Sequence, residues 1–180
     1  SISFLYEIAR IFEVPVSYFY EGYNSGCYEQ HRTGFNLLLI EDNIKDEVLI
    51  REAITDFPTK INIYSIREGD KASDFLRSLN QTTCLECVKP DLILLELKMS
   101  RANGIETLKT IKRDRQLHST PVVLLTDSTN INDMESSYNC NASGLIVKAQ
   151  TAEKLKEQMH NMLAYWTEVV SLPKKFASHH

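Results

Sequence analysis

The chain is poor in long apolar runs, and it carries no excess of positive charge. Its apolar runs fall short of the roughly 18–20 residues that cross a bilayer, and its start lacks the charge and cleavage site of a signal peptide. A net charge of -4 and a sequence pI near 5.7 exclude a global basic field that would attract nucleic acid or anionic lipid. We therefore expect a cytoplasmic protein with no membrane partner. Any DNA binding would need a local patch.

Cysteine is also scarce. The four cysteines of this chain do not make a disulfide scaffold. They are Cys27, Cys84, Cys87 and Cys140. Cys84 and Cys87 form one CxxC pair, but a structural zinc site needs four ligands and no second pair lies nearby. We favour reduced thiols in or beside a loop over a zinc site.

Composition and length predict one soluble domain with an appendage. Of the 180 residues, 43% are hydrophobic and 24% are charged, and domains commonly have roughly 100–150 residues. We divide the chain into a helical segment (residues 1–22), a linker with glycines (23–34), a main domain (35–172) and a tail (173–180). The helical segment predicts two short helices separated by Val14-Pro15, and such a pair buries too little to be stable alone. It needs a partner, either upstream residues or another chain.

From Phe35 onward, apolar strands alternate with amphipathic helices. The predicted strands cover residues 35–41, 61–66, 91–97, 121–126 and 144–148. The predicted helices cover residues 46–57, 72–80, 104–112 and 132–139, and a long helix closes the domain. The strands are continuously apolar rather than alternating, which favours a parallel sheet covered on both faces. We predict a doubly wound α/β domain, in which ligands bind outside the carboxyl ends of the strands.

Polar residues follow the predicted strands at the edge where a ligand is expected. They are Glu41 and Asp42 after the first strand, Glu96 after the third, Thr126 after the fourth and Lys148 after the fifth. One acid at a strand end is usually a solvated cap, but five such groups in this order are hard to obtain by chance. We expect them to meet in one pocket.

Three carboxylates this close repel each other, by about 3 kcal/mol per pair at roughly 5 Å and an effective dielectric near 20. Such a cluster becomes stable if it takes up a proton, binds a hard divalent cation, or receives an ammonium such as that of Lys148. Oxygen ligands suit Mg²⁺, and a hydroxyl and a lysine beside them suit a phosphoryl group. The residues alone leave these alternatives open.

About three quarters of the chain, from Phe35 to about Leu172, resembles the receiver domain of two-component response regulators. Four segments carry the resemblance: "LLLIEDNIKDEVLIREAI", "PDLILLELKMSRANGIE", "PVVLLTDS" and "GLIVKA". The resemblance implies a flavodoxin-like sheet of order 2-1-3-4-5, a role in phosphorelay signalling, and a sensor histidine kinase or another signalling protein as partner. The last helix, which ends in "YWTEVVSLP", is similar to that of the small regulators that partner cyanobacterial phytochromes.

The same resemblance implies a role for each polar residue. It implies Mg²⁺ as the cofactor and a set of metal ligands, namely Glu41, Asp42, Glu96 and the carbonyl of Lys98. Glu96 stands at the phosphoacceptor position, Thr126 is the switch hydroxyl, and Lys148 is the charge partner. The family has Asp at the position of Glu96. The extra methylene moves the oxygen by about 1.5 Å, and misplacements near 1 Å can cost on the order of 100-fold in rate.

Four further departures surround Glu96. The family usually has proline, glycine, an aromatic residue and proline where this chain has Ser100, Asn141, Leu145 and Ala149. Loss of the last proline removes the usual reason for a cis peptide. We therefore hypothesise a degenerate pseudo-receiver that is not an enzyme, in which Glu96 reaches Lys148 or Thr126 and holds the site in one state without phosphate.

The two ends of the chain suggest partners. Residues 1–22 resemble the last two helices of Cro/repressor-type helix-turn-helix domains, but the DNA-reading helices of that family would lie upstream of Ser1. We favour a repressor-like parent chain over a packing or dimerisation element. The last helix carries an apolar stripe of Leu155, Met159, Met162, Leu163, Trp166, Val169 and Val170. Its first half is expected in the core. From Tyr165 on, it either extends beyond the domain as a homodimer contact or folds back.

Three functions therefore compete. The leading interpretation is an atypical receiver that signals through protein–protein contacts. The first alternative is a conventional response regulator that is phosphorylated on Glu96 or controlled by Mg²⁺ alone. The second is a DNA-binding transcription regulator whose helix-turn-helix lies mostly upstream. A phosphatase of the HAD-like type is excluded because its two-aspartate nucleophile motif is missing.

Overall fold

The computed structural model describes residues 34–67, 90–100, 102–115 and 117–172. Several predicted features lie outside these residues. They are the helical segment 1–22, most of the linker 23–34, the helix over 72–80, the Cys84–Cys87 pair and the tail 173–180. Among the described residues, no helix combines the length and apolar content that a membrane span requires.

Five parallel strands form a single sheet. They are β1 (Phe35–Ile40), β2 (Ile61–Ile66), β3 (Leu92–Glu96), β4 (Val122–Thr126) and β5 (Gly144–Val147). Their order across the sheet is β2-β1-β3-β4-β5, and every neighbouring pair is parallel. The predicted doubly wound α/β fold and its strand order are confirmed.

Each α-helix that the structure describes follows a polar capping residue. The helices are α3 (Ile44–Thr55), α5 (Gly104–Arg113), α6 (Ile131–Asn139) and α7 (Ala152–Ala164). The side-chain oxygens of Asn43, Asn103, Asn130 and Thr151 accept hydrogen bonds from backbone N–H groups in the first turns. Because Asn43 caps α3, this helix begins two residues before the predicted start at Asp46.

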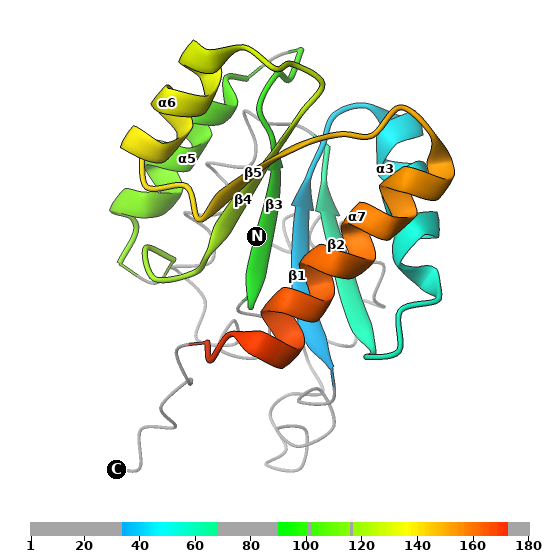
Figure 1. Cartoon of the computed structure of the whole chain (residues 1–180). Helices are drawn as coiled ribbons and strands as arrows, with labels where there is room; N and C mark the ends of the chain where they lie inside the picture. Colours follow the sequence, from blue (N-terminus) through cyan, green and yellow to red (C-terminus); the bar gives the residue numbers. More distant parts are fainter. Residues whose placement is uncertain (1–33, 68–89, 101, 116, 173–180) are drawn as a thin grey trace, which may run out of the picture.

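Helices cover both faces of the sheet. Figure 1 shows α5 and α6 on one side and α3 and α7 on the other. Along β1, Leu38 and Ile40 belong to the core cluster shared with α5, whereas Leu37 and Leu39 belong to the cluster shared with α3 and α7. Both faces of the strand are therefore buried, which explains why its sequence is continuously apolar.

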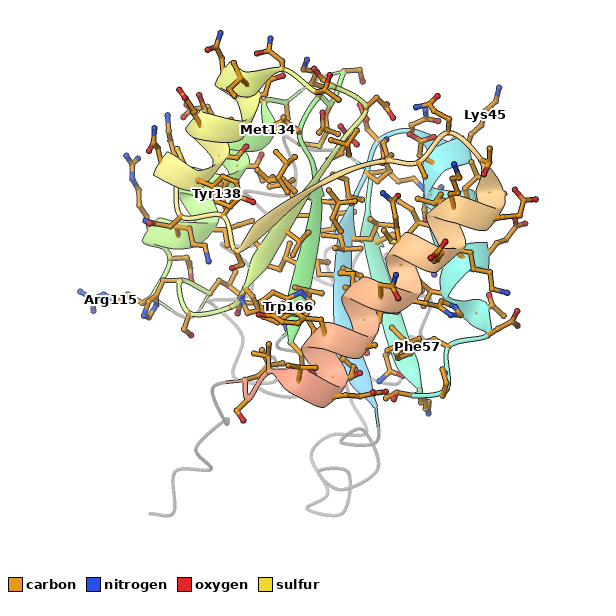
Figure 2. The ribbon with its side chains drawn as sticks, viewed as in Figure 1. Lys45, Phe57, Arg115, Met134, Tyr138 and Trp166 are labelled. Atoms are coloured by element: carbon orange, nitrogen blue, oxygen red, sulfur yellow. The ribbon has the colours of Figure 1, made fainter. Side chains whose placement is uncertain are left out.

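The last helix changes character after Ala164, where a π-helical turn, η3 (Tyr165–Val169), follows α7. The predicted core positions of α7 are all buried, namely Leu155, Met159, Met162 and Leu163. Trp166 packs against the same core cluster and lies beside the sheet (Figure 2), so at this residue the helix end follows the folded-back alternative. Val169, by contrast, is 72% exposed. The segment folds back in part and leaves Tyr165 and Val169 in solvent.

Candidate functional site

Four strands bring their polar ends to the same edge of the sheet. Glu41 follows β1, Glu96 is the last residue of β3, Thr126 is the last residue of β4, and Lys148 follows β5. Parallel register aligns these ends, since Glu96 pairs with Leu125 and Thr126 with Val147. Glu41, Glu96, Thr126 and Lys148 are all buried, with exposures of 1%, 3%, 0% and 7%.

The ammonium of Lys148 lies at the centre of a carboxylate cluster. Its Nζ is 2.6 Å from Asp46 Oδ2 and 2.9 Å from Glu96 Oε2. Asp127 Oδ2 and Glu41 Oε2 lie further away, at 3.5 Å and 3.8 Å. Of the three ways in which clustered acids become stable, the described structure therefore shows entry of an ammonium.

Asp46 and Asp127 belong to this cluster although the sequence analysis did not single them out. Asp46 lies in the first turn of α3, and Asp127 directly follows β4. Asp46 lies on a helix, whereas the prediction rests on strand ends; Asp127 does follow a strand, directly after the predicted Thr126. The position of Asp46, in the first helical turn after the acidic pair, could have indicated its role. The signal is weak, because the helix dipole alone makes an acid common there.

Burial controls the ionisation of the two glutamates. It raises the pKa of Glu41 from 4.5 to about 7, even though the N–H of Asn43 and the charge of Lys148 act in the opposite direction. Burial likewise raises the pKa of Glu96, opposed by the N–H of Lys98 and by Lys148. Burial would lower the pKa of Lys148, but its carboxylate partners outweigh burial and raise it. Lys148 is therefore charged at neutral pH.

One oxygen of each buried glutamate is fixed by the backbone of its own turn. Glu41 Oε1 accepts a hydrogen bond from Asn43 N–H at 2.9 Å, and Glu96 Oε1 accepts one from Lys98 N–H at 3.0 Å. The other oxygen of Glu96 faces Lys148. Glu41 Oε2 is buried and accepts no hydrogen bond. Glu96 is thus long enough to accept a hydrogen bond from its own turn and to form an ion pair with the ammonium at the same time.

Asp42 is held by Ser100 rather than by the lysine. Its Oδ2 accepts hydrogen bonds from both the N–H and the hydroxyl of Ser100, each at 2.5 Å. Proline, which the family usually has here, offers neither donor. The departure at Ser100 therefore creates a direct link between the turn after β1 and the turn after β3.

The predicted site residues Thr126 and Lys98 make contacts of other kinds. The hydroxyl of Thr126 accepts a hydrogen bond from Ser128 N–H at 3.0 Å, and its carbonyl accepts one from Lys148 N–H at 2.8 Å. The side chain of Lys98 pairs with Asp133 of α6 at 2.9 Å. Thr126 therefore orders the turn after β4, and Lys98 links the turn after β3 to α6.

Other side chains already engage the predicted metal ligands. In the part of the chain that the structure describes, no group of three or more His, Cys, Asp or Glu side chains is arranged to hold a metal ion. Lys148 occupies the space between Glu41 and Glu96, and Ser100 engages Asp42. Glu41 Oε2, buried and without a hydrogen bond, is the oxygen that a cation would fit.

The remaining departures have identifiable local consequences. Asn141 adopts a left-handed conformation with φ 63°, which asparagine tolerates better than most residues, so it can stand in for glycine. Leu145 packs against the core cluster on the α5 side. Ala149 N–H donates to Gln158 Oε1, and no cis peptide occurs among the described residues. The turn after Lys148 is therefore a trans turn held by a side chain.

The sheet order and the buried acid–lysine cluster at its carboxyl edge define a receiver-type signalling domain. The family model of the response regulator receiver domain matches residues 38–160, and the chain belongs to this family. It is therefore a receiver domain of two-component signalling.

Known relatives agree with this assignment. The chain is 32% identical over 145 residues to a probable methanogenesis regulatory protein, FilR2, of Methanothrix harundinacea, a match that covers 81% of this chain and 92% of FilR2. It is 30% identical over 137 residues to the response regulator Rcp1 of Synechocystis, covering 76% and 92%. The Mn²⁺-bound structure of Rcp1 superposes with a TM-score of 0.67, covering 78% of this chain and 99% of that structure.

The phosphorylated cyanobacterial phytochrome response regulator RcpA is also similar in structure. It superposes with a TM-score of 0.70 at 31% identity, covering 78% of this chain and 99% of RcpA. The similarity to phytochrome-associated regulators therefore extends over nearly their full length.

Proposed function

We propose that this receiver domain signals through protein–protein contacts without phosphoryl transfer, and that Glu96 holds the site in one state. The observation that supports the proposal is the position of Glu96: one oxygen accepts from Lys98 N–H, and the other lies 2.9 Å from Lys148 Nζ. The charge partner that a phosphoryl group would need is thus already engaged by the residue at the phosphoacceptor position.

Electrostatics support the same proposal. A phosphoryl group on Glu96 would add negative charge beside Glu41, Asp46 and Asp127, which already surround one ammonium. It would also require the buried ion pair between Glu96 and Lys148 to rearrange. Phosphoryl transfer depends mostly on positioning and charge stabilisation, and both are unfavourable here.

We propose that this site binds Mg²⁺ weakly. The ion would be held by Glu41, Asp42, Glu96 and the carbonyl of Lys98. Glu41 Oε2 is the buried oxygen that supports this set. The ion would compete with Lys148 for the carboxylates, so Lys148→Met should bind Mg²⁺ more tightly than the wild type. Calorimetric titration of both proteins measures this difference, and equal affinities would contradict the competition.

The partner is proposed to be a sensor histidine kinase or another signalling protein, as for receiver domains in general. A homodimer through the exposed part of η3 is proposed because Val169 is 72% exposed. DNA binding is proposed only for a parent chain that carries the helix-turn-helix upstream of residues 1–22.

Incubation with Mg²⁺ and acetyl phosphate tests the central proposal. Intact mass spectrometry should show no species heavier by one phosphoryl group, and RcpA, whose phosphorylated form is known, serves as the positive control for the reagent. Stoichiometric, base-labile phosphate on Glu96 would instead support the conventional response regulator. The phosphorylated state of the similar protein RcpA is the observation that favours the conventional response regulator as the second candidate.

The variant Glu96→Asp tests whether Glu96 itself or the residues around it prevent phosphorylation. If the shorter acid releases Lys148, the variant should take up phosphate from acetyl phosphate while the wild type does not. Labelling of the variant would locate the impairment in Glu96 alone. An unlabelled variant would place it in the surrounding departures, such as the link between Ser100 and Asp42.

A further inference from the structure

A single side chain of α7 forms hydrogen bonds with the backbone on both sides of Lys148. The amide of Gln158 donates from Nε2 to the carbonyl of Val147 at 2.9 Å, and its Oε1 accepts from Ala149 N–H at 2.9 Å. Val147 and Ala149 flank Lys148. One rigid amide therefore spans the residue that carries the ammonium.

The hydrogen bonds of Gln158 satisfy backbone groups that the sequence of this turn leaves without another partner among the described residues. Ala149 has a backbone N–H where proline would have none, and this group is partly buried. A buried donor without an acceptor is unfavourable, so the turn requires an oxygen at this point. Glutamine supplies that oxygen together with a donor for the carbonyl on the other side.

At the other end of the Lys148 side chain, a carboxylate of α3 binds the ammonium. Lys148 Nζ donates to Asp46 Oδ2 at 2.6 Å, the shortest of its four ion-pair distances. The side chain of Asp46 is 25% exposed, whereas that of Glu96 is 4% exposed, so the contact with Asp46 lies nearer to solvent. Figure 1 shows α3 and α7 next to each other on the same face of the sheet.

We infer that Gln158 and Asp46 are positioning residues for Lys148, one at its backbone and one at its ammonium, and that they couple the charge cluster to the α3–α7 face. The inference deepens the proposed function and rests on it, because it states what keeps Lys148 next to Glu96. A partner that shifts α7 or the first turn of α3 would thereby change the pairing in the site.

Nuclear magnetic resonance of the lysine ammonium groups tests the inference in the full chain labelled with ¹⁵N. A buried ammonium that donates to carboxylates exchanges its protons slowly, so Lys148 should give a resolved signal. Loss of this signal in Lys148→Arg identifies it. The signal should shift or disappear in Gln158→Met and in Asp46→Asn.

Matched controls lie beside each position. Glu157→Met places the same side chain one residue away on an exposed part of α7, and Glu52→Gln neutralises an exposed carboxylate on α3. Neither should move the Lys148 signal. Backbone amide spectra report whether each variant is folded, and Asp46→Asn, at a partly exposed position, provides a second test if Gln158→Met does not fold.

An unchanged Lys148 signal in folded Gln158→Met or Asp46→Asn would overturn the inference. The outcome is separate from that of the proposed function. Phosphate on Glu96 of the wild type would refute the proposed function whether or not Gln158 and Asp46 position Lys148. A signal that depends on both side chains, with no labelling of Glu96, supports the two proposals together.

Discussion

Glu96 differs from the family's usual aspartate by one methylene, and the structure shows what that length allows. Its two oxygens bridge the N–H of Lys98 and the ammonium of Lys148. The sequence predicted this meeting because strand ends in a parallel sheet converge at one edge. It did not predict Asp46 or Gln158, because their contacts depend on where a helical turn and a helix face lie relative to the sheet.

Glu41 makes the stability of the domain depend on pH. Burial raises its pKa to about 7 in the folded state from 4.5, so the folded protein binds this proton more tightly than the unfolded chain. The stabilisation is fully present below pH 4.5 and is lost as the pH rises towards 7, at up to about 1.4 kcal/mol per pH unit. Urea unfolding between these pH values measures the loss.

Glu41→Gln is the control for this pH dependence, because it keeps the hydrogen-bonding shape and removes the titration. Asp46 and Glu96 remain in both proteins, so their contributions are largely shared. The variant should gain stability relative to the wild type as the pH rises from 4.5 to 7. Parallel stability curves for the two proteins would contradict a raised pKa of Glu41 in the folded state.

At the scale of elements, the fit of α5 against the end of β3 sets the position of Glu96. A Cβ added to Gly104 would lie 2.5 Å from the carbonyl oxygen of Glu96 and 2.7 Å from Leu97 Cα. Both are backbone atoms that cannot turn aside. The first turn of α5 thus approaches the site so closely that only glycine fits.

Gly104→Ala should therefore destabilise the domain by about 1–3 kcal/mol, as overpacked positions do. Gly144→Ala is the matched control, because its added Cβ would meet its nearest neighbour, Val123 Cγ2, at an ordinary 3.8 Å. Urea denaturation of both variants measures the difference. Equal stabilities would contradict the close approach at Gly104.

At the scale of the whole molecule, the repeat of apolar strands and amphipathic helices was enough to predict the sheet. The end of the last helix was not predictable in the same way. Its apolar stripe continues through Trp166 and Val169, yet Trp166 packs on the core and Val169 faces solvent. Both residues lie in the π-helical turn after Ala164, which the apolar spacing does not predict.

The proposed homodimer depends on this turn. Val169→Lys places a charge at the exposed apolar position, so it should weaken self-association while leaving the fold intact. Sedimentation velocity over a range of concentrations measures the effect. Thr167→Lys would be a poorer choice because the Thr167 hydroxyl bonds the carbonyl of Leu163. A wild type that stays monomeric at all concentrations would contradict the dimer.

The central claim is that Glu96 and Lys148 stabilise each other in the buried site without phosphate. A double-mutant cycle of Glu96→Gln and Lys148→Met, measured by urea unfolding, tests it most directly. The account predicts a coupling free energy of roughly 0.5–3 kcal/mol, because Lys148→Met should cost less once Glu96 has lost its charge. Additivity within about 0.3–0.5 kcal/mol would contradict the claim.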